Sequence, residues 1–287
     1  MPPTRQDLEV LAPAGNWELL LAALDAGADA VYIGLKGMSA RPNPWGFDLH
    51  EAQEACKTVH AAGRRVYFAL NAEYSEFHAN QFLDAIQALD GVADAFIIGD
   101  WGLLDRGSKM GLKTPLQSST LLGVYNYQTA RFLKELGVSR IILNTNLYLD
   151  EIAGITLGCP EMRYEIIAYG GVCFNDNNRC RLPHFNIHDK YLVGCGLDYQ
   201  IFRGGSGETA PKPGSIHMPD IDLSSTLQVY TELGITSFKI EGRTRPQSYL
   251  RESIGALRRA IENTLDQPNR GRLFHYLADL SQARRQR

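Results

Sequence analysis

Apolar segments and amphipathic segments alternate along the whole chain, and this alternation restricts the fold more than any other feature. Each apolar segment reads as a buried strand, and the stretch that follows it has helical spacing. Strands that alternate with helices form parallel sheets with the helices outside. We expect eight strands, at residues 8–14, 29–34, 64–71, 94–100, 114–119, 140–144, 163–170 and 236–242.

Eight such units in 287 residues predict a closed (β/α)8 TIM-like barrel, with a doubly wound open sheet as the alternative. A hydrophobic content of 44% is enough for a sizeable core, so we expect one barrel domain over residues 1–287. Residues 171–220, between the seventh and eighth strands, form a long loop rich in glycine and proline. Long loops in compact domains are usually functional.

Residue alternation within the strands predicts what faces the barrel lumen. In the last strand, Phe238 and Ile240 share one face, and the other face is charged. The apolar face must meet the helices, so the polar face points inward. The expected lumen residues are Glu9, Tyr67, Asn71, Glu165, Tyr169, Lys239 and Glu241. Because the first and last strands are neighbours, we expect Glu9 to pair with Lys239; a purely structural ion network is the alternative to a catalytic one.

Barrel active sites lie at the carboxyl ends of the strands. The residues that the sequence places at this end are Arg41, Asn71, Asp100, Gln117, Asn144 and Cys173.

Three cysteines, Cys173, Cys180 and Cys195, fall within 23 residues of the long loop. Thiolates bind iron and zinc, so this cluster predicts a metal site. Zinc fits poorly, because C-x6-C-x14-C lacks the closely spaced pair that is usual in zinc sites. Cys56 and Cys159 lie apart from the cluster, and we expect them to be small buried thiols.

The formal charge of -3 gives no global reason to expect nucleic-acid binding, although a local basic patch is compatible with it. No basic leader with an apolar core precedes the first strand, and no apolar stretch is long enough to cross a bilayer. We expect a soluble, cytoplasmic protein without membrane insertion.

Three motifs carry a family resemblance: APAGNWELLLAALDAGADAVYIG, YEIIAYGGVCFNDNNRC and the late KIEGR. With them, most of the chain resembles the collagenase-like U-32 peptidase family. The resemblance implies oxygen-independent hydroxylases that act on a ubiquinone precursor or on bases of tRNA and ribosomal RNA. It also implies a 4Fe-4S cluster on four cysteines, with prephenate as the hydroxyl donor.

By this resemblance, Cys173, Cys180 and Cys195 match three of the four cluster ligands. Residues 196–240, where the fourth cysteine is expected, contain none. Three alternatives stay open: the fourth ligand is His184, His188 or Asp189; the fourth iron is open to substrate; or the cluster has been lost.

The resulting hypothesis is iron–sulfur-dependent hydroxylation of an aromatic ring or a nucleobase. Arg41 and Arg243 are candidates for holding a dicarboxylate donor, and Glu165 and Glu241 for moving protons or positioning it. Lys239 is a further catalytic candidate. A collagenase-like peptidase, supported by the family name alone, is the second hypothesis.

A third hypothesis is a non-catalytic, cluster-carrying subunit in a hetero-complex with a family paralogue. We expect a small-molecule or nucleobase substrate. We also expect the length to leave no room for the extra C-terminal domain of longer members, which weakens but does not remove the RNA option.

Overall fold

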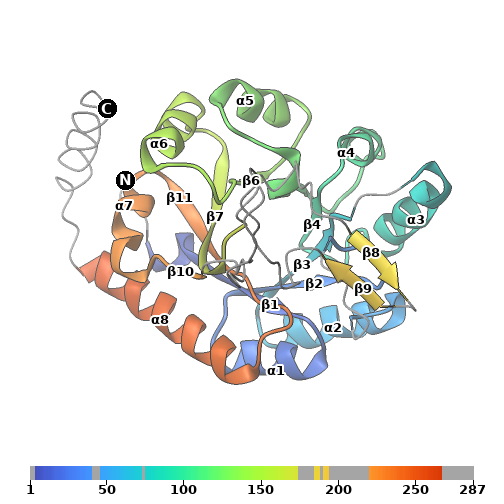
Figure 1. Ribbon diagram of the computed structural model, residues 1–287, viewed down its shortest axis with the longest axis horizontal. Helices are drawn as coiled ribbons and strands as arrows, with labels where there is room; N and C mark the ends of the chain where they lie inside the picture. The colour runs from blue at the N-terminus through green and yellow to red at the C-terminus, as the bar shows by residue number, and fades with distance from the viewer. Residues whose placement is uncertain are drawn as a thin grey trace, which may run out of the picture.

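The computed structural model describes residues 4–40, 46–72, 75–173, 184–187, 190–193 and 220–266. Eight parallel strands close into a barrel, because each pairs with the next and β11 pairs with both β7 and β1. The predicted (β/α)8 barrel is confirmed, and the open sheet is excluded (Figure 1). The barrel strands are β1 (Glu9–Ala14), β2 (Ala30–Gly34), β3 (Arg65–Leu70), β4 (Ala95–Ile98), β5 (Leu116–Ser118), β6 (Arg140–Ile142), β7 (Arg163–Gly171) and β11 (Ile235–Ile240).

Eight α-helices in the described part of the chain surround the barrel (Figure 1). They are α1 (Trp17–Asp25), α2 (Leu49–Ala61), α3 (Ala79–Leu89), α4 (Trp101–Ser108), α5 (Tyr127–Glu135), α6 (Leu149–Gly158), α7 (Leu227–Glu232) and α8 (Gln247–Asp266). Four begin at an Asn or Asp whose side chain accepts a backbone N–H of the first turn, namely Asn16, Asp48, Asp100 and Asn126. No helix among these residues is both long and apolar enough to cross a membrane.

The segment between β7 and β11 contains three short strands that the sequence did not predict. β10 (Asp220–Asp222) pairs antiparallel with the end of β7. β8 (His184–Ile187) and β9 (Lys190–Val193) form a separate two-stranded antiparallel sheet. All three begin within residues 171–220, which the sequence predicted to form one long loop.

The core has two layers, as the alternation predicted. Val31, Phe68 and Phe238 belong to the outer layer between sheet and helices, whereas Leu11, Tyr67 and Ile97 belong to the lumen layer. Cys56 and Cys159 are fully buried in the outer layer, which confirms their expected role. Burial raises the pKa of the Cys56 thiol to about 12, so this thiol stays protonated and unreactive at neutral pH.

The prediction that Tyr169 faces the lumen is wrong. A register shift separates the pairs Lys239–Ile167 and Ile240–Tyr169, so β7 carries one extra residue there. Tyr169 thereby shares the outward orientation of Ile240, and its ring lies 5.7 Å, centroid to centroid, from that of Tyr249 on α8.

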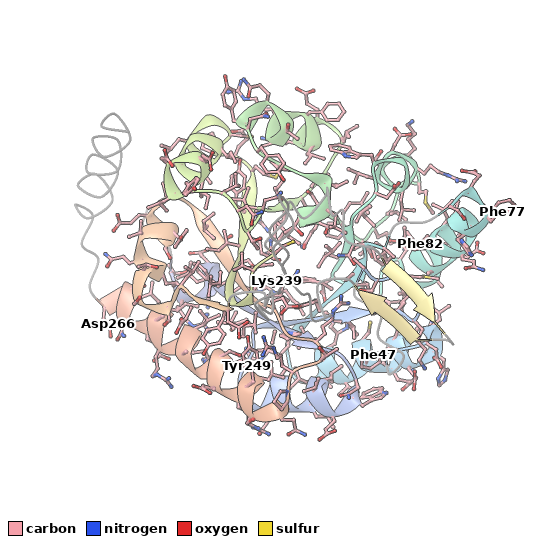
Figure 2. All side chains as sticks on the ribbon, viewed as in Figure 1. Phe47, Phe77, Phe82, Lys239, Tyr249 and Asp266 are labelled. Carbon is pink, nitrogen blue, oxygen red and sulfur yellow. The ribbon has the colours of Figure 1, made fainter. Side chains whose placement is uncertain are left out.

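Phe238→Ala should lower the free energy of unfolding by about 3–5 kcal/mol, because it leaves a cavity where a fully buried ring contacts the outer core. Urea unfolding measures this change. Phe77→Ala is the matched control, because the Phe77 side chain is 94% exposed at the edge of the molecule (Figure 2), and it should change stability by less than about 0.5 kcal/mol. Equal effects of the two substitutions would contradict the described packing.

Candidate active site at the barrel mouth

A cavity of about 130 Å³ opens where the strands of the barrel end. Its apolar lining includes Ala69, Ile97, Ile142 and Ile167, all from barrel strands. Its polar lining comes from Tyr32, Asn71, Ser119, Thr120, Lys239, Glu241 and Arg243. This is the end of a (β/α)8 barrel at which enzymes of this fold carry out chemistry.

Two cations lie against the ring of Tyr32 at this cavity. The Lys239 Nζ is 4.3 Å and the Arg243 Cζ is 5.7 Å from the ring centroid, distances at which the ring attracts a cation. The Tyr32 hydroxyl donates to the carbonyl of Ile240 at 3.0 Å, which fixes the ring. The two cations are 8% exposed each, so they are held in place before any ligand arrives.

The position of Arg243 explains the glycine that ends β2. The Arg243 guanidinium donates a short hydrogen bond to the Ser39 hydroxyl. A Cβ at Gly34 would collide with Arg243 Nη1 and would lie 2.9 Å from Ser39 Oγ. Only glycine at this position lets the guanidinium pass close to the backbone of β2.

Asn71, at the end of β3, connects three loops of the mouth. Its Oδ1 accepts from the Ala40 N–H at 3.1 Å and from the Ser39 hydroxyl at 3.4 Å. Its Nδ2 donates to the Ser119 hydroxyl at 3.3 Å. Asn71 therefore holds the rim of the cavity together.

A buried ion network lies below the cavity floor. Arg140 Nη1 lies 2.6 Å from Glu9 Oε1 and 3.2 Å from Glu165 Oε2, and so joins the two carboxylates. The Ser237 hydroxyl lies 2.8 Å from Glu9 and 3.0 Å from Glu165. Lys239 Nζ contacts Glu165 Oε1 at 3.1 Å, which connects the network to the cavity above.

The expected Glu9–Lys239 pair is wrong, and the strand register explains why. Glu9 lies opposite Ser237, whereas Lys239 lies opposite Leu11, so Lys239 sits one lumen layer nearer the mouth. Glu9 pairs instead with Arg140 and with Arg65, whose Nη2 is 2.6 Å from Oε2. Sequence reasoning missed Arg140; its lumen position could have been inferred because Arg140 shares a strand face with Ile142 and alternates with the outward-facing Ile141.

Burial and charge oppose each other in the pKa values of this network. Burial acts to raise the pKa of Glu9, but the cations Arg140 and Arg65 and the hydrogen bonds from Tyr67 and Ser237 hold it below its ordinary value. Burial lowers the pKa of Lys239, and the neighbouring cations Arg243 and Arg140 lower it further. The attraction of Glu165 opposes these effects without cancelling them. Glu9 is thus ionised at neutral pH, and the Lys239 ammonium loses its proton more readily than an exposed one.

The predicted site residues divide into three groups. Lys239, Glu241 and Arg243 line the cavity, and Glu165 lies beneath it, fully buried. Cys173 lies two residues beyond the end of β7 and is half-buried. Arg41, Cys180, Cys195, His188 and Asp189 lie outside the described residues, as does the side chain of His184.

Among the residues that the structure describes, no group of three or more His, Cys, Asp and Glu side chains could hold a metal ion. Because two of the three clustered cysteines lie outside that part of the chain, the proposed cluster ligands stay a prediction.

The sequence was compared with known proteins. Residues 15–286 match the family model for peptidase family U32, so the chain belongs to this family. It is 29% identical to the tRNA hydroxylation protein P of Helicobacter pylori (strain J99), over 89% of this chain and 65% of the relative. It is 28% identical to the 23S rRNA 5-hydroxycytidine C2501 synthase of Escherichia coli, over 91% of this chain and 40% of the relative.

The chain therefore spans about two-thirds or less of the length of these relatives. The solved structure of the U32 peptidase Mk0906 superposes with a TM-score of 0.53 and 12% sequence identity, over 83% of this chain and 94% of the other. This similarity supports the fold alone.

Arg140→Ala should destabilise the protein by about 3–5 kcal/mol, because it leaves Glu9 and Glu165 as buried charges without their shared partner. Urea unfolding at neutral pH measures the loss. The control Arg251→Ala removes an exposed pair with Asp25 and should cost at most about 1 kcal/mol. A similarly small cost for Arg140→Ala would contradict the network.

The lowered pKa of Glu9 also predicts how stability depends on pH. The ionised Glu9 carboxylate stabilises the fold fully at pH values above 4.5, the ordinary pKa of glutamate. This stabilisation is lost as the pH falls through the lower pKa that Glu9 has in the folded state. Glu9→Gln should therefore lose stability at about pH 6 and reduce the fall in stability on acidification. Glu135→Gln, at an exposed position on α5, serves as the control. If the wild type, Glu9→Gln and Glu135→Gln all lost the same stability on acidification, Glu9 would not have this role.

Proposed function

We propose that this protein hydroxylates a base of RNA at the cavity of the barrel mouth, with an iron–sulfur cluster held by Cys173, Cys180 and Cys195. The observation that carries the proposal is the buried Lys239–Arg243 pair on Tyr32, which lines that cavity. The names of two relatives, a tRNA hydroxylation protein and an rRNA hydroxycytidine synthase, support RNA as the substrate.

The cation pair suits a co-substrate with carboxylate groups. Two buried cations attract an anion strongly, and the Arg243 guanidinium can donate parallel hydrogen bonds to one carboxylate. Prephenate, a dicarboxylate, is the proposed hydroxyl donor. A base must leave the helical stack before an enzyme can act on it, so we propose that a single unstacked base enters beside the donor.

The two predicted carboxylates take different roles in this proposal. Glu241 lines the cavity, so it can move a proton to or from a bound ligand. Glu165 is fully buried and contacts Arg140, Ser237 and Lys239, so its role is to position the Lys239 ammonium. An iron–sulfur cluster would supply electron transfer or a Lewis-acidic iron when bound.

Cys173 fits as a ligand by position. Cys173 follows β7, and the parallel neighbour of β7 is β11, which carries Lys239 at the cavity. The loop that bears Cys173 therefore begins at the same end of the barrel as the cavity. Arg41 is the other proposed donor-binding cation. In the sequence it directly follows Ala40, which lines this cavity.

The peptidase hypothesis finds less support. The described residues include one hydrogen-bonded Ser–His pair, Ser75 and His78, at 3.0 Å. These residues lie three positions apart in one exposed turn, and neither lines the mouth cavity. Such an arrangement is a local contact between two exposed side chains rather than a nucleophile with its base.

The proposal is tested by nucleoside mass spectrometry of tRNA and rRNA from a strain that lacks the gene, complemented with variants. A hydroxylated nucleoside should disappear on deletion and return with the wild-type chain and with Arg251→Gln. Cys173→Ala should fail to restore it, and Arg243→Gln should reduce it about tenfold or more through loss of a charge-assisted hydrogen bond.

Iron and sulfide analysis of the purified chain complements this test. Retained activity in Cys173→Ala would reject a cluster-dependent mechanism, and unchanged nucleosides with release of peptides from gelatin would favour the peptidase. Activity only on co-purification with a family paralogue would favour the partner-subunit alternative.

A further inference from the structure

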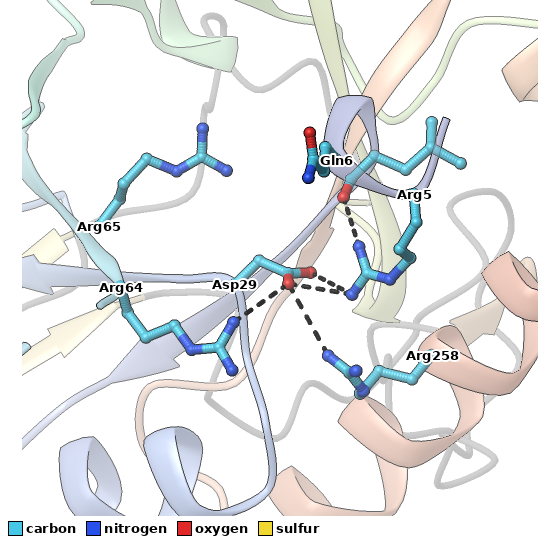
Figure 3. A pocket seen from close by; sticks show the side chains of 7 residues that line it. Arg5, Gln6, Asp29, Arg64, Arg65 and Arg258 are labelled. Atoms are coloured by element: carbon cyan, nitrogen blue, oxygen red, sulfur yellow. Dashed lines mark hydrogen bonds and ion pairs between the residues drawn. The ribbon is translucent and has the colours of Figure 1, made fainter. Parts of the chain in front are cut away.

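Four arginines line a second pocket, at the opposite end of the barrel, where the strands begin, and three of them point toward Asp29 (Figure 3). This pocket has a volume of about 270 Å³. Its arginines are Arg5 from the turn η1 (Arg5–Asp7), Arg64 and Arg65 at the start of β3, and Arg258 from α8. Segments far apart in the sequence thus bring four permanent positive charges to one place.

Among the described residues that line the pocket, Asp29 supplies the single carboxylate, and it lies between three of these arginines, Arg5, Arg64 and Arg258. Arg5 Nη2 lies 2.9 and 3.0 Å from its two oxygens. The nearest guanidinium nitrogens of Arg64 and Arg258 lie 3.5 and 3.7 Å from Oδ1. Asp29 also accepts the backbone N–H of Val10 at 2.9 Å, so its negative charge is already shared among several donors.

Arg65 turns away from Asp29 toward the lumen, where it contacts Glu9 at 2.6 Å. Glu9 does not neutralise it fully, because the same carboxylate binds Arg140 at 2.6 Å. The four lining arginines and the one lining aspartate together carry three net positive charges. If Glu9 is counted as neutralising Arg65 completely, two positive charges remain. The pocket therefore keeps a cationic surplus in a chain whose formal net charge is -3.

A bracing role explains two of these arginines but not all four. Arg5 donates to the carbonyl of Leu8 at 2.8 Å, and Arg258 donates to that of Gly27 at 2.5 Å, so both tie neighbouring segments together. Arg64 reaches Asp29 at the outer limit of a hydrogen bond, and its side chain is 36% exposed. Like charges held this close repel one another, and a second anion in the pocket would relieve that repulsion.

We propose that this pocket binds a phosphate group, through Arg64 together with Arg5 and Arg258. Guanidinium groups match phosphate oxygens in pairs, and an open pocket walled by several of them suits a tetrahedral oxyanion. The phosphate belongs either to a small phosphorylated solute or to an RNA backbone. This site is separate from the mouth cavity and does not depend on the proposed hydroxylation.

Calorimetric titration of the full chain with inorganic phosphate, pyrophosphate and a short single-stranded RNA tests the proposal. Arg64→Gln should weaken binding about tenfold or more, since it removes a charge-assisted hydrogen bond at low structural cost. The charge reversal Arg64→Glu should weaken it further. Arg251→Gln, which removes an exposed arginine of α8 paired with Asp25, is the matched control and should bind as the wild type does.

The three titrants distinguish the sources of the phosphate. Binding of pyrophosphate or phosphate that is weakened in Arg64→Gln indicates a small solute, and an Arg64-dependent response to RNA alone indicates the backbone. No binding of any titrant by the wild-type chain would overturn the proposal. So would equal affinities of Arg64→Gln and Arg251→Gln, provided that urea unfolding shows both variants to be folded.

Discussion

The buried network of Glu9, Arg140, Glu165 and Lys239 is the constraint on which the rest of the barrel depends. Charges removed from water are tolerated only when each has a partner at close range, and here β1, β6, β7 and β11 each supply one. The network therefore specifies how these strands are staggered around the lumen. It also supports Lys239 from below, so that its ammonium stays beside Tyr32 at the cavity. Figure 2 labels Lys239 near the middle of the barrel.

The same network connects the two ends of the barrel. Arg65 reaches Glu9 from the pocket where the strands begin, and Lys239 reaches Glu165 from the cavity where they end. Both the pocket and the cavity are lined by more cations than carboxylates in the described chain, although the protein as a whole is slightly acidic. Local arrangement, rather than composition, creates the anion-attracting sites. Net charge alone gave no indication of either.

Much of the fold and part of the site were predictable from sequence. All eight barrel strands lie where the apolar segments placed them, and the inward orientation of Glu9, Tyr67, Glu165 and Lys239 followed from alternation. Tyr169 failed this rule because one extra residue in β7 inverts the alternation beyond it. The predicted Glu9–Lys239 pair does not form, because residues of neighbouring strands can still lie at different heights in the lumen. Glu9 is level with Ser237, and Lys239 is level with Leu11.

The sequence by itself determined the order of strands and helices and the face of each strand that meets the helices, because both depend on residues close together in the chain. The sequence also shows a glycine at position 34, but the close approach of Arg243 that requires a glycine there is visible only in the structure. Only the tertiary structure decided which charges meet, since Arg140 is 131 positions from Glu9 and finds it only when the barrel closes. Strand register, bulges and the convergence of three arginines on Asp29 are long-range outcomes of packing, which local patterns do not encode.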